Sequence, residues 1–149
     1  MVFLPITTAL VNSSRVASSD FLTQICTATL AIYPDSGPVF PWMGYLVEEQ
    51  GVFTGACAFK SLPVDGTVEI AYFTFPEYEG NGNATNMAKH LIRIASAHGA
   101  RRVTAQTLPE HNASTHILQK LQFVFAGVVQ HPEDGEVWEW GYPVVEKIK

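Results

Sequence analysis

The feature that most constrains the fold is a change of periodicity between residues 67 and 99. Residues 67–75 are rich in β-branched and aromatic types, which predicts a β-strand. From there on, apolar residues recur at the spacing of one helix face: Ala84, Met87, Ala88, Leu91 and Ala95. Gly99 follows as a helix-ending signal. The sequence therefore predicts a strand, a short loop and a well-defined helix in succession.

The loop between this strand and helix suits an anion. Gly80 and Gly82 allow close approach to the backbone because they carry no Cβ. The first amides of a helix lack partners within the helix and lie at the positive end of its dipole. A simple tight turn is the alternative, since Asn and Gly tolerate positive φ. The Lys and Ser/Thr of a P-loop are missing, and Thr85 stands where a dinucleotide fingerprint has its third glycine.

The remaining pattern predicts a mixed sheet of the α/β or α+β type. Helical spacing and capping residues indicate helices at 18–32 and 113–121, the second opened by Asn112. Strands are expected at 44–47 and 52–60, as an antiparallel meander with 67–75, then at 102–107, and as a closing hairpin at 123–129 and 136–142. Turn residues at 33–38 indicate a loop.

Length and charge exclude several classes of protein. The chain has 149 residues, which suits a single domain over 1–149. Its formal net charge of −5 argues against a nucleic-acid partner, because phosphates require a basic footprint. No apolar run approaches the roughly 18–20 residues that span a bilayer, so no membrane partner is expected.

The cysteines and the N-terminus favour a cytoplasmic protein. Cys26 and Cys57 form no spaced set with histidines, so neither a metal site nor a disulfide framework is predicted. The first residues lack the basic flank of a signal peptide. Charged residues make up only 15%, which hints at an apolar contact face and a homodimer.

Two motifs together resemble the GNAT acetyltransferase superfamily, in particular the branch of ribosomal-protein N-terminal acetyltransferases. Residues 79–84 (EGNGNA) are similar to the (Gln/Arg)-x-x-Gly-x-(Gly/Ala) signature for acetyl-CoA. Residues 107–123 (TLPEHNASTHILQKLQF) look like the Asn-x-Ser cap and the closing Leu-x-Lys-x-Gly-Phe of the family. The likeness covers about residues 44–142. It implies a mainly antiparallel sheet flanked by helices, with a splay between the fourth and fifth strands.

The resemblance also implies which residues bind acetyl-CoA as cosubstrate. Pantetheine lies along the splayed strand and the pyrophosphate on the loop, with an Asn and a Ser near the thioester. The matching positions here are Phe73, Thr74, Phe75, Glu79, Gly80, Asn81, Gly82, Asn83, Ala84, Thr85, Asn112 and Ser114. From the residues alone, Asn112 is a helix N-cap. Glu79 replaces the usual Gln or Arg, and Gln122 replaces the glycine before Phe123.

Acetyl transfer to an amine requires a base and an acid. Glu69 is the candidate general base, because strand alternation places it with Ala71 and Phe73, where desolvation raises a carboxyl pKa. The alternative is a carboxylate that reaches solvent or an arginine. Many family members use a tyrosine as the general acid where Leu118 stands here. Ser114 or water is then the substitute, or the thiolate leaves unassisted, because a thiol pKa of about 8.5 makes it a tolerable leaving group.

The expected function is transfer of an acetyl group from acetyl-CoA to a primary amine by direct attack. The acceptor is either a protein N-terminus or a small amine, and the sequence does not choose between them. Two alternatives remain open at this stage. One is an acyl-CoA-binding module without transfer, consistent with Glu79 and Leu118; the other is a dinucleotide-dependent oxidoreductase built on the glycine loop.

Overall fold

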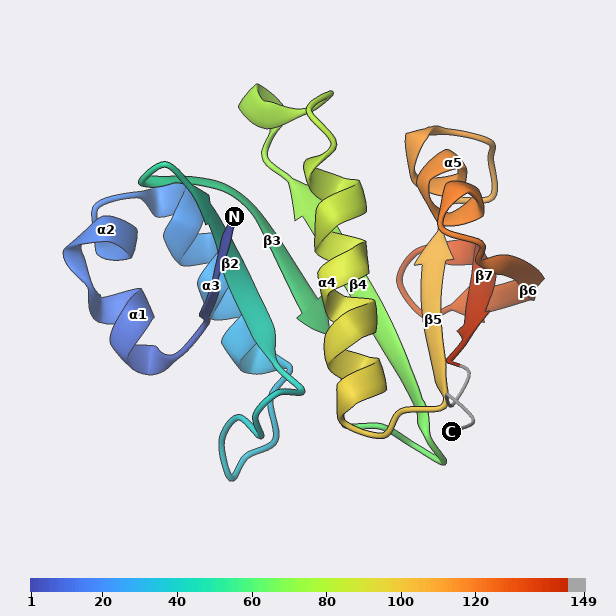
Figure 1. The fold of residues 1–149 in the computed structure, drawn as a ribbon. Coiled ribbons are helices and arrows are strands. Elements are labelled where there is room, and N and C mark those ends of the chain that lie inside the picture. Colours follow the sequence, from blue (N-terminus) through green and yellow to red (C-terminus); the bar gives the residue numbers. More distant parts are fainter. Residues whose placement is uncertain (145–149) are drawn as a thin grey trace.

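The computed structural model describes residues 1–144, in which seven strands form one sheet (Figure 1). The elements in chain order are β1 (Val2–Pro5), α1 (Thr8–Asn12), α2 (Ser14–Ala17), α3 (Asp20–Ala31), β2 (Gly44–Glu49), β3 (Val52–Phe59), β4 (Thr67–Thr74), the 3-10 helix η1 (Pro76–Tyr78), α4 (Asn83–Ala97), β5 (Arg102–Thr107), α5 (Ala113–Lys120), β6 (Val124–His131) and β7 (Gly135–Pro143). The sheet order is β1-β2-β3-β4-β5-β7-β6. Only β4 and β5 pair in parallel among these neighbours, which confirms the expected mixed, mainly antiparallel fold.

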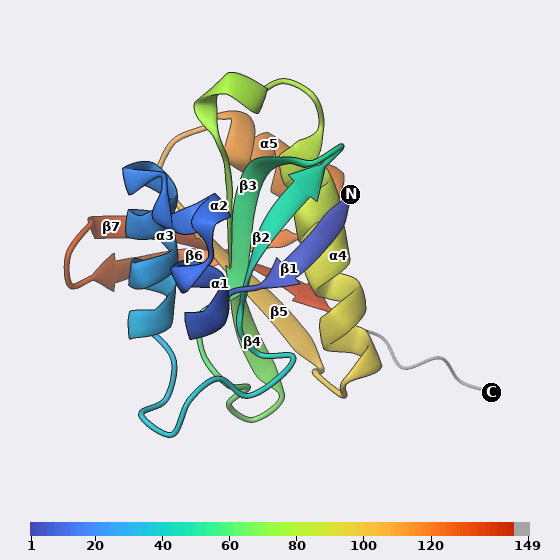
Figure 2. The same ribbon diagram turned by 90° about the vertical axis from the view of Figure 1, so that its left-hand side faces the viewer.

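Helices cover both faces of the sheet (Figure 2). On one face α4 packs over β3 and β4, and its Met87 and Leu91 are fully buried there. On the other face α3 closes a second cluster that includes Cys26 and Phe75. Because strand residues alternate, Ile70 of β4 belongs to the α4 face and Glu69 to the opposite face.

The strands β4 and β5 pair over their first residues and then separate. Parallel pairing joins Thr67–Ile70 to Arg102–Ala105 and ends there, although β4 continues to Thr74 and β5 to Thr107. Over these last residues β4 stays paired with β3, and β5 with β7. Each strand thus keeps one neighbour and loses the other, and a wedge opens between them. This is the expected splay of the fourth and fifth strands.

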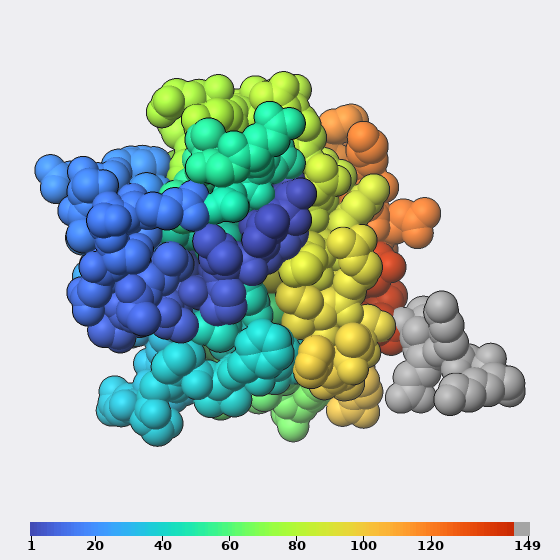
Figure 3. All heavy atoms as spheres, turned by 60° about the vertical axis from the view of Figure 1, so that its left-hand side comes forward, coloured from blue at the N-terminus to red at the C-terminus, as the bar shows by residue number. Residues whose placement is uncertain are grey.

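The N-terminal segment contains elements that the sequence pattern does not indicate. Residues 2–5 form β1, the edge strand beside β2, and α1 and α2 precede α3. Phe3 of β1 stacks on His90 of α4, with ring centroids 3.6 Å apart. Figure 3 shows the resulting contact between the N-terminal segment, in dark blue, and α4, in yellow. The segment therefore completes one side of the sheet and fastens it to the long helix.

Capping contacts confirm the predicted helix starts. Ser19 caps α3 and accepts a hydrogen bond from the Leu22 amide at 3.2 Å. Asn112 caps α5: its Oδ1 accepts from the Thr115 amide at 3.1 Å, and its own amide donates to Thr115 Oγ1 at 2.9 Å. After α5, Gln122 has a φ of 73°. The turn therefore adopts the left-handed conformation that suits the glycine of the family motif, although the residue here is a glutamine.

Two surface properties bear on partners. No helix within residues 1–144 is both long and apolar enough to cross a bilayer. At the other edge of the sheet, β6 exposes Val124, Phe125 and Val128. Homodimerisation stays a prediction.

Gly55 of β3, paired with Thr74 at the open end of the wedge, allows β4 and α4 to approach closely. A Cβ built there lies 2.8 Å from the Phe73 carbonyl oxygen and 3.1 Å from the Met87 methyl carbon. Because the first of these contacts is with backbone, Gly55→Ala must displace β4. We expect the free energy of unfolding to fall by about 1–3 kcal/mol, measured by urea titration. An unchanged midpoint would show that the strand yields without cost.

Candidate active site

Two cavities meet in the wedge between β4 and β5. The larger, of ≈ 480 Å³, lies between the loop before α4 and the start of α5. The smaller, of ≈ 250 Å³, extends toward Glu69 and the tip of the β6–β7 hairpin. Tyr72 and Ser114 line both. A molecule in the larger cavity can therefore contact one in the smaller cavity beside these two side chains.

The larger cavity ends at the N-terminus of α4. The N-cap is Gly82, with a φ of 77°, and no side chain caps the helix. No acidic residue occupies the first turn, so the amides of Asn83, Ala84 and Thr85 remain available to a ligand. The Asn81 and Asn83 side chains both donate to the Tyr78 carbonyl oxygen, at 3.3 and 3.4 Å, and hold the loop in place. These amides and the helix dipole together suit an anion, and the assignment of the coenzyme phosphates to them stays a prediction.

The free edge of β4 supplies further amides to the wedge. The Lys60 amide donates to the Glu69 carbonyl oxygen, and the Phe75 amide donates to the Thr54 carbonyl oxygen. In an antiparallel pair such bonds fall on alternate residues. Tyr72 and Thr74 therefore direct their backbone groups away from β3, into the wedge. An extended ligand can pair with this edge as an added strand does.

Most of the predicted coenzyme residues line the larger cavity. They are Phe73, Thr74, Glu79, Gly80, Gly82, Asn83, Ala84, Thr85 and Ser114. Phe75 instead is buried against Phe21, with ring centroids 5.0 Å apart. Asn81 is occupied within the loop, and the Asn112 side chain is occupied by capping and by donation to Glu110 at 3.3 Å. None of these three lines either of the two cavities.

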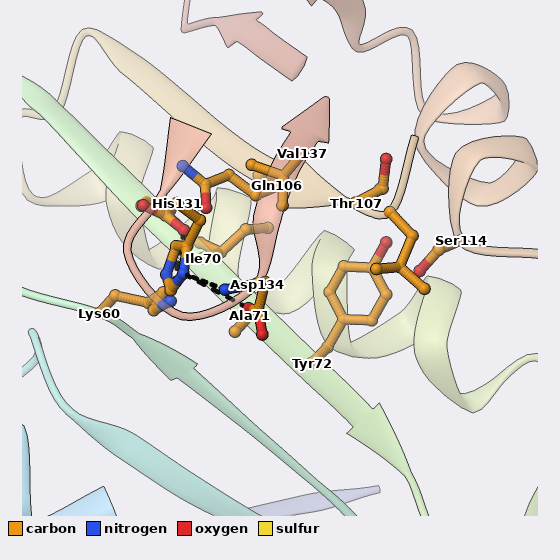
Figure 4. A pocket seen from close by; sticks show the side chains of 13 residues that line it. Lys60, Ile70, Ala71, Tyr72, Gln106, Thr107, Ser114, His131, Asp134 and Val137 are labelled. Carbon is orange, nitrogen blue, oxygen red and sulfur yellow. Dashed lines mark hydrogen bonds and ion pairs between the residues drawn. The ribbon is translucent and has the colours of Figure 1, made fainter. Parts of the chain in front are cut away.

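Glu69 lines the smaller cavity and is paired with a lysine. Its Oε2 lies 3.6 Å from Lys60 Nζ, and its side chain is 26% exposed. Burial raises the pKa of the Glu69 carboxyl, and the Lys60 ammonium opposes this rise. The carboxyl is therefore partly desolvated and meets a lysine rather than the arginine of the alternative interpretation, and its role as a base stays a prediction. Figure 4 shows Lys60, His131 and Asp134 at this end of the cavity.

At the other end, Tyr72 is a functional candidate that the sequence analysis missed. Figure 4 shows its hydroxyl close to Ser114. Burial raises the pKa of Tyr72, and the Ser114 hydroxyl opposes this rise. Leu118, at the position where many family members have a tyrosine, is fully buried in the core. Tyr72 lies two residues after Ile70 on the same strand, so strand alternation places both side chains on the α4 face of the sheet. This alternation could have been read from the sequence.

Comparison with known proteins identifies the family. The acetyltransferase (GNAT) domain family matches residues 11–124. The chain belongs to this family. Acetyl-CoA is the cosubstrate of GNAT enzymes, which agrees with an anion site at the end of an extended cavity. Membership also favours acetyl-CoA over a dinucleotide as the ligand of the glycine loop.

Individual relatives add narrower likenesses. An amino-acid acetyltransferase of Ralstonia nicotianae is 30% identical over 97 residues, which are 64% of this chain and 21% of that protein. The chain thus spans about a fifth of that relative. The L-amino acid N-acyltransferase MnaT of Escherichia coli is 29% identical over 133 residues, 87% of this chain and 71% of MnaT.

A solved structure supports the fold over nearly the whole chain. The ribosomal L7/L12 alpha-N-protein acetyltransferase RimL aligns with a TM-score of 0.72. The alignment covers 95% of this chain and 92% of that one, at 14% identity. At this identity the likeness concerns the fold alone.

Proposed function

We propose that this chain transfers the acetyl group of acetyl-CoA to a primary amine. The observation that carries the proposal is the meeting of two cavities at Tyr72 and Ser114. One cavity ends in helix amides that suit a pyrophosphate, and the other contains a carboxylate that suits an amine. Such an arrangement brings a thioester and an amine together from opposite sides of the sheet.

The coenzyme occupies the larger cavity in this proposal. Its pyrophosphate lies on the amides from Gly80 to Thr85, and its pantetheine arm follows the free edge of β4. The thioester then lies beside Tyr72, whose backbone amide polarises the carbonyl. Glu79 also lines this cavity and is exposed, so its carboxylate has room to turn toward solvent, away from the phosphates.

The reaction is a direct attack without a covalent enzyme intermediate. The neutral amine nitrogen forms the new bond to the acetyl carbon, the carbon–sulfur bond breaks, and the amine proton passes to Glu69. Glu69 lies three residues before Tyr72, about 10 Å along the strand, so one or two waters carry this proton. The Tyr72 hydroxyl, close to Ser114, donates a proton to the departing thiolate and is then reprotonated from solvent, to which Glu69 releases the amine proton.

A small amine is the better-supported acceptor. The curated relatives named above are amino-acid acyltransferases, which supports a free amino acid. The fold neighbour RimL, whose name gives a protein as its substrate, keeps a protein N-terminus as the second candidate. A cavity of ≈ 250 Å³ accommodates an amino acid without requiring an open peptide groove.

A thiol-release assay across amines tests the proposal. With acetyl-CoA alone we expect only slow release of coenzyme A, and with an accepted amine a saturable increase and an acetylated product of matching mass. Binding of acetyl-CoA without release for any amine class would leave the chain an acyl-CoA-binding module. A peptide with a free N-terminus, included in the same panel, distinguishes the two acceptor classes.

Tyr72→Phe tests the proton donor. We expect kcat to fall by about 10²-fold, because general acid catalysis contributes on this order, with little change in the KM for acetyl-CoA. Tyr142→Phe is the matched control, since Tyr142 packs against Phe123 outside both cavities. An unchanged kcat in Tyr72→Phe would assign the proton to water or to Ser114.

A further inference from the structure

The pairing of Glu69 with Lys60 creates a problem for the base. The two residues are cross-strand neighbours, since the Lys60 amide donates to the Glu69 carbonyl oxygen at 2.9 Å. Their side chains lie on the same wall of the smaller cavity, with Nζ 3.6 Å from Oε2. A carboxylate that is held by an ammonium is a poorer proton acceptor than a free one. Full activity therefore requires something to draw Lys60 away.

An amino-acid acceptor itself carries a group, its carboxylate, that can compete with Glu69 for Lys60. We propose that Lys60 binds the carboxylate of an amino-acid acceptor and that this contact releases Glu69 to accept the amine proton. The proposal rests on the acetyl transfer proposed above. The Lys60 side chain is 42% exposed and has a flexible four-carbon stem, so it can turn from Glu69 to a ligand. Acceptors that carry a carboxylate are then selected by affinity and also by rate.

His131 supplies a second donor on the same wall. Its Nδ1 accepts hydrogen bonds from the amides of Glu133 and Asp134, both at 3.2 Å. The neutral ring therefore carries its proton on Nε2, which leaves an N–H for a ligand in the cavity that His131 lines. A carboxylate held between this N–H and the Lys60 ammonium receives hydrogen bonds from two elements, β3–β4 and the β6–β7 hairpin.

The charges around Glu69 set the direction of the effect. Burial raises the pKa of Glu69, and Glu139 of β7 raises it further, while Lys60 and His131 lower it. Asp134, on the same cavity wall, lies 3.5 Å from His131 Nδ1 through its Oδ2. When a ligand carboxylate neutralises Lys60, the largest lowering influence disappears and the pKa of Glu69 rises. The base then becomes more effective only when an acceptor is in place.

Matched pairs of acceptors test this proposal. L-leucine and isoamylamine differ by the carboxylate, as do L-phenylalanine and 2-phenylethylamine. We expect wild type to prefer the amino acid in kcat/KM, and Lys60→Met to reduce this preference by about tenfold or more. Lys60→Arg keeps the charge and should retain most of it. Lys89→Met, which removes an exposed lysine of α4, should leave it unchanged. Comparing ratios between variants cancels the different basicities of the amines.

A second measurement separates specificity from mere stability. In wild type the acid limb of kcat should lie at higher pH with the amino acid than with its decarboxylated partner, and Lys60→Met should remove this difference. Equal preference in wild type, or a preference that survives Lys60→Met, would overturn the proposal. If no amine is acetylated, the proposed function fails first. Calorimetry of L-leucine with the coenzyme A complex then decides: binding that depends on Lys60 supports the carboxylate site, and absence of binding refutes it.

Discussion

Gly82→Asp should weaken coenzyme A binding by on the order of 10²–10³-fold. Like charges about 4 Å apart cost about 4 kcal/mol at an effective dielectric of 20, and the new carboxylate lies where the pyrophosphate is expected. A Cβ at Gly82 meets nothing within 4 Å, so the cost inside the protein is the backbone strain of a φ of 77° rather than a clash of the Cβ. Isothermal calorimetry with coenzyme A measures the loss.

Gly82→Asn is the matched control, because its side chain differs from that of Gly82→Asp mainly in charge. Both Asn and Asp tolerate the left-handed region better than other residues, and the φ of Gly82 is 77°. We expect the two variants to have similar melting temperatures and the Asn variant to bind coenzyme A much more tightly than the Asp variant. Equal affinities would mean that the phosphates do not lie at the N-terminus of α4.

Glu69→Gln should lower kcat by about 10²–10³-fold near neutral pH, since a positioned general base contributes on this order. The wild-type rate should rise with pH through the pKa of Glu69, which burial raises above the ordinary value. The variant should lack this limb. Its defect should shrink at alkaline pH, where solvent itself deprotonates the amine. A profile of kcat against pH at saturating acceptor checks all three expectations.

Glu139→Gln is a control variant that should shift the pH profile without lowering the maximal rate. Glu139 raises the pKa of Glu69 through its charge, so neutralising it should move the acid limb to lower pH and leave the plateau rate intact. The account of the base would be wrong if Glu69→Gln kept the wild-type limb, or if the Glu139 variant lost as much activity as the Glu69 variant.

The sequence predicts those elements whose apolar spacing and capping residues lie within the element or directly beside it. The α4 helix follows from five apolar positions at helical spacing, and α5 from the Asn112 cap. By contrast, β1 is only Val2–Pro5 long and is fixed by pairing with β2 and by stacking of Phe3 on His90. Four residues are too few to show an alternating pattern, and the tertiary contacts that fix this strand cannot be read from its own sequence. The sequence therefore under-predicts the N-terminal edge of the sheet.

The candidate site divides along the same line. The loop proposed to bind the pyrophosphate is contiguous in sequence, so Gly80 and Gly82 indicate it directly. The smaller cavity instead brings together Lys60, which follows β3, Tyr72 of β4 and His131 of the β6–β7 hairpin. Each of these residues is unremarkable in its own stretch of sequence. The pairing of β7 with β5 and the tertiary fold around it bring the hairpin tip into the same cavity as Glu69.

The most direct test is a crystal structure of the chain with coenzyme A. We expect both phosphates of the diphosphate to accept hydrogen bonds from amides between Gly80 and Thr85, and the thiol to end beside Tyr72 and Ser114. Density for the diphosphate at any other surface, or a thiol that never reaches the cavity containing Glu69, would contradict the mechanism proposed for this protein.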